Sequence, residues 1–183
     1  MTSPQSLAAL AEPTEAELIS RIRQGDPDAL SAAYYRHAGP LLTLAVRLLG
    51  SGAEAQDVIQ DLFVGLPEAL LRYEENGLFR AWLRRIVIRM ALMRLRAQRR
   101  RREVVLEPAI GWPARAPANA ADNLDLARAM AQLPDDYRIV VVLKAIEGYS
   151  HEEIAGILGI RRNASEVRFH RALERLRVLL EVL

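Results

Sequence analysis

The 183-residue sequence contains no cysteine, which excludes a disulfide framework and any metal site built from thiolate ligands. Only 5% of its residues are aromatic, so leucine, isoleucine, valine and alanine must supply most of the core. No apolar run reaches about eighteen residues, the length typical of a membrane span, and the amino-terminus lacks the basic start and apolar centre of a signal peptide. We therefore expect a cytoplasmic chain with no insertion in a membrane.

Histidine is also scarce, which bears on catalysis. The three histidines are His37, His151 and His170, and none has a companion at ligand spacing. The His-Glu-Glu sequence at 151–153 resembles the start of the H-E-x-x-H zinc motif, but position 155 is alanine. A glycine-rich phosphate loop and a nucleophile elbow are missing too. We expect no metal, no cofactor and no enzymatic activity.

Charge is distributed unevenly along the chain, although the formal net charge is only +2. Residues 1–75 contain eleven acids and five arginines, whereas residues 79–102 contain ten arginines and no acid. Apolar positions between 79 and 91 share one helical face, and Arg84, Arg85 and Arg89 fall beside it. A charged run is commonly just a solvated surface. The absence of acids over this length, however, favours an anionic partner, which we take to be nucleic acid.

Residues 133–176 predict a helix-turn-helix with a corner at Gly159. Ser150 and Glu153 have the spacing of a capping box before the first helix, and Asn163 and Glu166 repeat it before the second. The second helix has an apolar seam at positions 165, 169, 172, 176, 179 and 183, which includes one serine. A second stripe consists of Ala164, Arg168, Arg171 and Arg175. This pattern suits the major groove of DNA, and the alternative is a helical hairpin whose arginines are only solvated.

The two segments resemble the extracytoplasmic-function sigma factors, the small promoter-specificity subunits of bacterial RNA polymerase in the sigma-70 family. Region four is matched at Leu133-Pro134, Tyr137-Arg138, Glu147-Gly148-Tyr149-Ser150 and His170-Arg171-Ala172. Region two is matched by Phe79-Arg80-Ala81-Trp82-Leu83, the F-x-x-W-L signature, and by a D-V-x-Q-[ED]-x-F pattern from Asp57 to Phe63. Two such motifs in the right order are more specific than either alone.

The resemblance implies an all-α chain of two small helical domains joined by a flexible linker. We expect a disordered tail at 1–13, sigma region 2 at 14–102, a linker at 103–122 and sigma region 4 at 123–183. Patterning predicts helices at 14–24, 27–37, 39–49, 53–72, 78–100, 123–132, 135–147, 151–158 and 164–181. Thr14 and Glu17 predict a capping box for the first. Pro67 predicts a kink or break between 63 and 68.

The resemblance also implies the partners and their contact residues. Core RNA polymerase would bind through its β′ coiled coil and β flap, with the first contact made by Asp57, Gln60, Asp61 and Phe63. The minus-ten promoter element would be contacted by Tyr73, Asn76, Arg80, Arg84, Arg85 and Arg89, with Tyr73 as a stacking surface for an unstacked base. The minus-thirty-five element would be contacted by Arg161, Arg162, Ala164, Arg168, Arg171 and Arg175. An anti-sigma factor is the expected regulator.

A decoy remains as the alternative function. Such a protein would keep the fold and bind an anti-sigma factor, but it would not initiate transcription. Binding of promoter DNA by the arginine stripes distinguishes the two.

Overall fold

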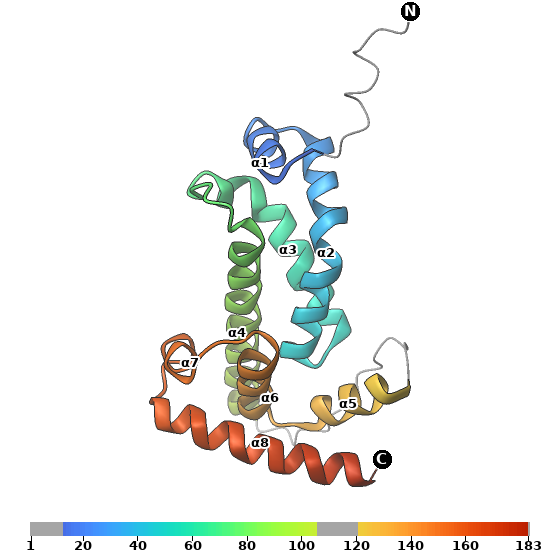
Figure 1. The fold of residues 1–183 in the computed structure, drawn as a ribbon, viewed down its shortest axis with the longest axis vertical. Helices are drawn as coiled ribbons and strands as arrows, with labels where there is room; N and C mark the ends of the chain where they lie inside the picture. The colour runs from blue at the N-terminus through green and yellow to red at the C-terminus, as the bar shows by residue number, and fades with distance from the viewer. Residues whose placement is uncertain (1–12, 106–120, 183) are drawn as a thin grey trace, which may run out of the picture.

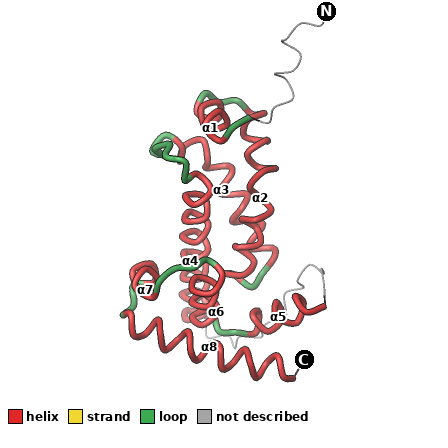
Figure 2. Tube along the Cα trace, in the orientation of Figure 1, coloured by secondary structure: helices red, strands yellow, loops and turns green. Residues whose placement is uncertain are grey.

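The computed structural model describes residues 13–105 and 121–182, and within these ranges the chain forms helices and no strand, as Figure 2 shows. The predicted all-α class is confirmed. The tail prediction falls almost entirely on residues 1–12, which lie outside the described ranges. The linker prediction is only partly covered, because helix extends to Val105 and resumes at Ala121, leaving 106–120 outside the described ranges.

Four helices form the amino-terminal unit: α1 (Glu15–Arg23), α2 (Pro27–Leu49), α3 (Gly52–Leu70) and α4 (Phe79–Val105). Helix α2 packs against α1, α3 and α4, so it is the centre of this bundle (Figure 1). The first helix begins with the predicted capping box, in which Thr14 Oγ1 accepts from the Glu17 amide at 3.3 Å and the Thr14 amide donates to Glu17 at 2.8 Å. Hydrogen bonds to the Glu17 carboxylate from the backbone and side chain of Thr14 lower the pKa of Glu17.

Two predicted helix breaks are absent. The predicted helices 27–37 and 39–49 are one helix, α2, with Pro40 inside it, and α3 continues through Pro67 without the predicted break. An internal proline costs about 3 kcal/mol. Leu66 and Leu70, on either side of Pro67, are fully buried, and burial of one leucine contributes about 1.5–3 kcal/mol. Packing of the flanking turns therefore outweighs the cost of Pro67.

The carboxy-terminal unit consists of α5 (Ala121–Gln132), α6 (Asp135–Val141), the π-helical segment η3 (Val142–Ile146), α7 (His151–Leu158) and α8 (Arg162–Val182). The predicted helix 135–147 is thus α6 with a π-helical last turn. Helix α8 packs against α5, α6 and α7.

The start of α8 differs from the prediction. Because α8 begins at Arg162, Asn163 lies inside the first turn and the predicted Asn163–Glu166 capping box is wrong. Glu166 instead pairs with Arg162 at 2.9 Å.

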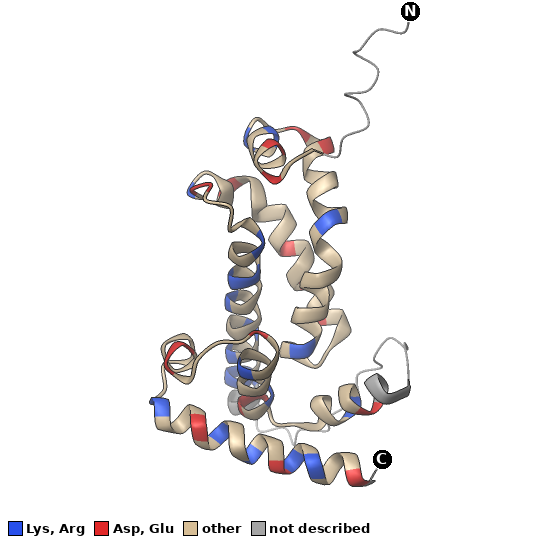
Figure 3. Ribbon diagram, viewed as in Figure 1, with Lys and Arg blue, Asp and Glu red and all other residues tan. Residues whose placement is uncertain are grey.

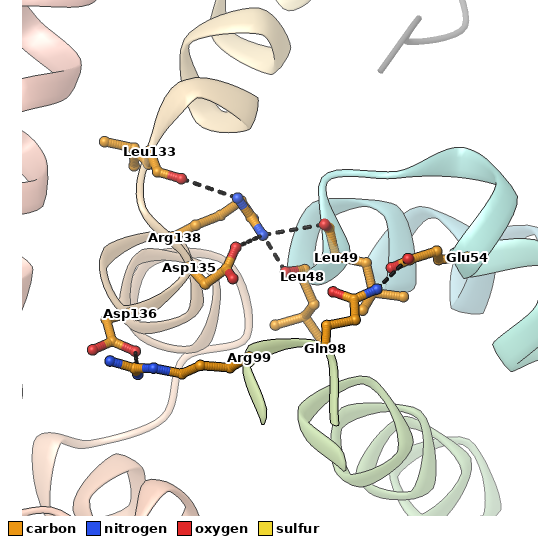
Figure 4. A network of polar contacts seen from close by, with 9 residues as sticks. All are labelled: Leu48, Leu49, Glu54, Gln98, Arg99, Leu133, Asp135, Asp136 and Arg138. Atoms are coloured by element: carbon orange, nitrogen blue, oxygen red, sulfur yellow. Dashed lines mark hydrogen bonds and ion pairs between the residues drawn. The ribbon is translucent and has the colours of Figure 1, made fainter. Parts of the chain in front are cut away.

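The two units share a continuous apolar core, since α2 packs against both α5 and α6. Arg138 of α6 lies at this junction and is only 4% exposed. Its guanidinium donates to the carbonyls of Leu48 and Leu49 at the end of α2, each at 3.1 Å, and to the Leu133 carbonyl at 3.0 Å (Figure 4). Asp135 supplies the counter-charge at 2.5 Å. A cation at a helix carboxy-terminus is favoured by the helix dipole.

Substitution of Arg138 tests this junction. Arg138→Met removes the donors to Leu48 and Leu49 and leaves the two carbonyls without a partner. We expect the free energy of unfolding, measured by urea denaturation, to fall by about 3 kcal/mol. The control is Arg161→Met, which changes an exposed arginine of the same unit. An equal effect of both substitutions would contradict the assignment.

A buried histidine predicts a pH dependence of stability. His37 is 3% exposed, and burial lowers its pKa below the ordinary value. Its ring packs edge-on against Phe79, and its Nε2 lies 3.6 Å from a Glu15 carboxylate oxygen. The folded state keeps His37 neutral while the unfolded state gains a proton, so the free energy of unfolding should decrease as pH falls below about 6.5. Urea titrations between pH 7.5 and 5.5 should show a shallower decrease for His37→Phe; an unchanged decrease would refute this.

Candidate nucleic-acid and protein interfaces

Helices α7 and α8 form the predicted helix-turn-helix, and its first helix is capped as expected. Ser150 Oγ accepts from the Glu153 amide at 3.2 Å, and the Ser150 amide donates to the Glu153 carboxylate at 2.8 Å. Hydrogen bonds to the Glu153 carboxylate from the Ser150 amide and, at 2.7 Å, from the Ser150 hydroxyl lower the pKa of Glu153. Gly159 ends α7 with a φ of +68°, a left-handed conformation that glycine adopts readily, and this turn directs the chain straight into α8.

The seam of α8 faces inward as predicted. Ser165, Ala172 and Leu176 are buried, and Phe169 and Leu179 are partly buried; position 183 lies outside the described residues. The seam's serine has an explanation that the sequence did not reveal. Its hydroxyl lies 2.9 Å from His151 Nδ1, and the His151 ring packs edge-on against Phe169. Burial lowers the pKa of His151, so a neutral imidazole joins α7 to α8 through this hydrogen bond.

Most of the arginines assigned to α8 are exposed, and Figure 3 marks the basic residues of this helix in blue. The exposed ones are Arg161, Arg162, Arg171 and Arg175, whereas Ala164 is partly buried. Arg175 also lies over the ring of Tyr137, with 5.7 Å from its Cζ to the ring centroid. Arg168 differs from the others, because its side chain is 30% exposed and pairs with Asp136 of α6 at 3.3 Å.

The arginines of α4 likewise include exposed ones and one that is paired with an acid of the other unit. Arg80, Arg85 and Arg89 are exposed on the helix. Arg84 is paired instead with Glu147, at the end of η3: its Nε donates to the carboxylate at 2.8 Å. The Glu147 side chain is 4% exposed and the Arg84 side chain is 32% exposed, so the pair is partly shielded from water. The structure therefore brings the α4 arginines next to the helix-turn-helix, which the sequence analysis did not anticipate.

The loop before α4 departs from the prediction at Tyr73. Asn76 is exposed and its Oδ1 accepts from the Leu78 amide at 3.1 Å. Tyr73, however, is only 6% exposed, because its ring packs on Phe79 and Trp82 with centroid distances of 5.6 and 4.7 Å. In this conformation it is not an exposed stacking surface, which corrects the predicted role. Burial raises the pKa of the Tyr73 hydroxyl.

The face assigned to polymerase lies on α3. Asp57, Gln60 and Asp61 are all exposed there, while Phe63 is 6% exposed and belongs to the core. Arg94 of α4 lies beside this face and pairs with Asp57 at 2.6 Å and with Asp61 at 3.9 Å. Phe63 therefore packs beneath these exposed side chains, and its ring is not exposed at the surface.

An apolar groove of about 800 Å³ lies between α2 and α3 next to these acids. Gln60, Phe63 and Val64 line it from α3, and Tyr34 and Tyr35 line it from α2. Tyr35 is 84% exposed and Val64 is 76% exposed, and the Tyr34 ring packs edge-on against Phe63 at 4.9 Å. The sequence analysis did not identify the two tyrosines as part of a binding surface. Their position outside the apolar period of α2 could have indicated it.

Among the described residues, histidines and acids form no group of three that could bind a metal ion. Within residues 13–105 and 121–182, no helix combines the length and apolar character needed to span a membrane.

Comparisons with known proteins give a consistent family. The family model described as Sigma-70 region 2 matches residues 33–101. The family model described as Sigma-70, region 4 matches residues 123–176. RNA polymerase sigma factor CarQ of Myxococcus xanthus is 34% identical over 165 residues, which cover 88% of this chain and 95% of CarQ. ECF RNA polymerase sigma factor SigW of Bacillus subtilis is 30% identical over 173 residues, covering 87% and 92%.

Solved structures agree with this. The sigma factor RpoE in complex with the anti-sigma factor NepR, from Bartonella quintana, superposes with a TM-score of 0.63 at 25% identity, covering 83% of this chain and 96% of RpoE. CnrH in complex with the cytosolic domain of CnrY gives a TM-score of 0.52 at 31% identity, covering 90% and 96%. The chain belongs to the sigma-70 family and is an extracytoplasmic-function sigma factor, a promoter-specificity subunit of transcription initiation.

Proposed function

We propose that the chain acts in the cytoplasm, where it binds core RNA polymerase through the α2–α3 face and reads a promoter with the arginines of α4 and α8. The observation that carries this proposal is the pairing of a capped helix-turn-helix, whose second helix exposes arginines, with a long helix whose residues 79–102 contain no acid. The proposal assigns 14–102 to sigma region 2 and 123–183 to sigma region 4. It gives the chain no catalytic residue, since its role is to position the polymerase.

The two arginine sets would contribute differently to promoter recognition. Arg168 and Arg171 lie on the stripe of α8 that would face base edges, where arginine makes bidentate contacts with guanine. Arg161 directly precedes that helix and Arg162 is its first residue, where contacts with phosphates would position the module without reading sequence. On α4, Arg80, Arg85 and Arg89 are the exposed members of the minus-ten set, and Asn76 lies in the adjoining loop.

Charge and shape support the polymerase contact. Asp57 and Asp61 present negative charge beside a groove lined by Tyr34, Tyr35 and Val64. Such a surface fits a helix with basic and apolar residues, which we assign to the β′ coiled coil of core polymerase. Exposed tyrosines are common anchors of protein interfaces. The β flap is assigned to the carboxy-terminal unit through the family resemblance alone.

An anti-sigma factor is the proposed regulator. RpoE and CnrH, the two structural relatives named above, were solved in complex with NepR and with the cytosolic domain of CnrY, and NepR is an anti-sigma factor. The similarity covers 83% and 90% of this chain, which supports the proposal of a regulator of the same kind.

Charge reversal tests the polymerase contact. Asp57→Lys together with Asp61→Lys should weaken binding to core polymerase at least about thirtyfold, because loss of close interface charge pairs costs about 2 kcal/mol or more. Tyr35→Ala should weaken it about tenfold by removing an apolar anchor. Binding is measured by titration with labelled core enzyme, and circular dichroism checks the fold. The matched control reverses two other exposed acids of the same unit, Asp28 and Glu74. Equal binding by the test and control variants would refute the assignment.

Arginine substitutions test promoter reading in the reconstituted holoenzyme. Arg168→Ala and Arg171→Ala should each lose about 1–3 kcal/mol of discrimination at individual base pairs. Arg161→Ala and Arg162→Ala should weaken binding to all duplexes alike and reduce the salt dependence by about one unit per lost contact. Affinities for promoter duplexes and their single-base variants, taken across salt concentrations, separate the two patterns. If all four variants bind and transcribe normally while an anti-sigma factor still binds, the decoy function holds instead.

A further inference from the structure

A cavity of about 780 Å³ lies between α4 and α7 (Figure 1). Its first wall is one stripe of α4, whose members follow one another at three- or four-residue spacing: Trp82, Ile86, Arg89, Met93 and Arg96. Its second wall belongs to the start of the helix-turn-helix and consists of Tyr149, Glu153, Gly156 and Ile157. The volume is that of a small-molecule site, which is typically about 300–1,000 Å³.

The arginines that line this cavity have no acidic partner. Elsewhere along α4, arginines such as Arg84 and Arg94 are paired with acids. By contrast, the guanidinium groups of Arg85, Arg89 and Arg96 form no ion pair and no hydrogen bond within the described part of the chain. An anion that enters the cavity is attracted by all three charges, because the walls concentrate their field.

The acid in the lining does not cancel these charges. Among the described residues that line the cavity, Glu153 is the one acid. Its carboxylate already accepts hydrogen bonds from the Ser150 amide at 2.8 Å and from the Ser150 hydroxyl at 2.7 Å. Three arginines and one capped carboxylate leave the cavity with an excess of positive charge.

Most of the remaining lining is apolar and is partly open to solvent. Trp82, Ile86 and Ile157 are partly buried, and Met93 is 53% exposed although its side chain is large and apolar. Gly156 contributes no side chain to the α7 wall, and a Cβ built there would meet no atom of another described element within 4 Å. An apolar molecule therefore has a surface to cover and room to occupy.

We propose that the α4–α7 cavity is a binding site for a small amphiphilic anion, in which an acidic group such as a carboxylate, phosphate or sulfonate is attached to an aromatic or aliphatic body. Guanidinium groups bind such oxyanions through charge-assisted hydrogen bonds, and the apolar lining removes the body of the ligand from water. A neutral apolar ligand leaves the guanidinium groups unused, and an inorganic anion leaves the apolar walls in water.

Binding of this ligand affects promoter recognition. Arg85 and Arg89 belong to the minus-ten set, so the ligand and DNA phosphates compete for the same guanidinium groups. This competition rests on the function proposed above, whereas the ligand site itself does not.

Two fluorescent dyes test the site, and both are titrated into the full chain. Anilinonaphthalene sulfonate carries an acidic group on an aromatic body, and phenylnaphthylamine is the same body without the sulfonate. Gly156→Leu fills the open space at the α7 wall and should weaken binding of both dyes at least about tenfold. Arg96→Gln should weaken binding of the sulfonate dye about fivefold, the effect of one exposed ion pair, and leave the neutral dye unaffected.

Matched controls make the same two changes away from the cavity. Gly65→Leu alters an exposed glycine of α3 that also has open space around it, and Arg47→Gln alters an exposed arginine of α2. Neither Gly156 nor Arg96 belongs to the proposed polymerase or promoter contacts. Circular dichroism checks the fold of every variant.

Equal affinity of the sulfonate dye for the test and control variants would overturn the site, because the dye would then bind elsewhere on the chain. An equal loss of both dyes in Arg96→Gln would overturn the preference for an anion. If Gly156→Leu does not fold, Arg96→Gln must still weaken the sulfonate dye alone, or the proposal is wrong.

The competition is measured separately. A DNA duplex added to the wild-type chain with bound sulfonate dye should release the dye. If the dye stays bound, the competition is overturned and the proposed role of Arg85 and Arg89 in DNA binding is contradicted. The ligand site is decided by the dye affinities of the variants and does not depend on that result.

Discussion

The buried guanidinium of Arg138 is the contact on which the arrangement of the two units depends. A charge this deep in the protein is tolerated only where partners surround it, and here the end of α2, the Leu133 carbonyl and Asp135 all face it. Gly50, the left-handed residue that ends α2, leaves room for this approach, since a Cβ at that position would lie 3.2 Å from the Arg138 Cζ. The conformation of one helix end in the first unit thus determines where the second unit docks.

Docking at this point has electrostatic consequences for the DNA-reading residues. Once α6 lies against the end of α2, Glu147 meets Arg84 and Asp136 meets Arg99, so acids of the second unit neutralise part of the cationic surface of α4. The same surface attracts phosphate when it is free. The guanidinium groups of Arg84 and Arg99 are therefore paired with acids of the second unit in this arrangement.

The sequence predicted those features that depend on neighbours within a few residues. The capping boxes at Thr14 and Ser150, the turn at Gly159 and the buried seam at Ala172 and Leu176 follow from local hydrogen bonding and helical period. The sequence did not predict those features that depend on tertiary packing. Burial of Leu66 and Leu70 overrides Pro67, and packing against Trp82 buries Tyr73. The Ser165–His151 bond and the Arg84–Glu147 pair join residues 14 and 63 positions apart, which no periodicity relates.

Transcription from genomic DNA tests the central account most directly. Core RNA polymerase from the source organism is incubated with its genomic DNA, with and without this chain, and transcript starts are mapped. The account predicts a set of starts that appears only with the chain and shares two sequence elements, one near position minus ten and one near minus thirty-five. If the chain adds no start to those made by core enzyme alone, although it binds that enzyme, the account of it as a promoter-specificity subunit is contradicted.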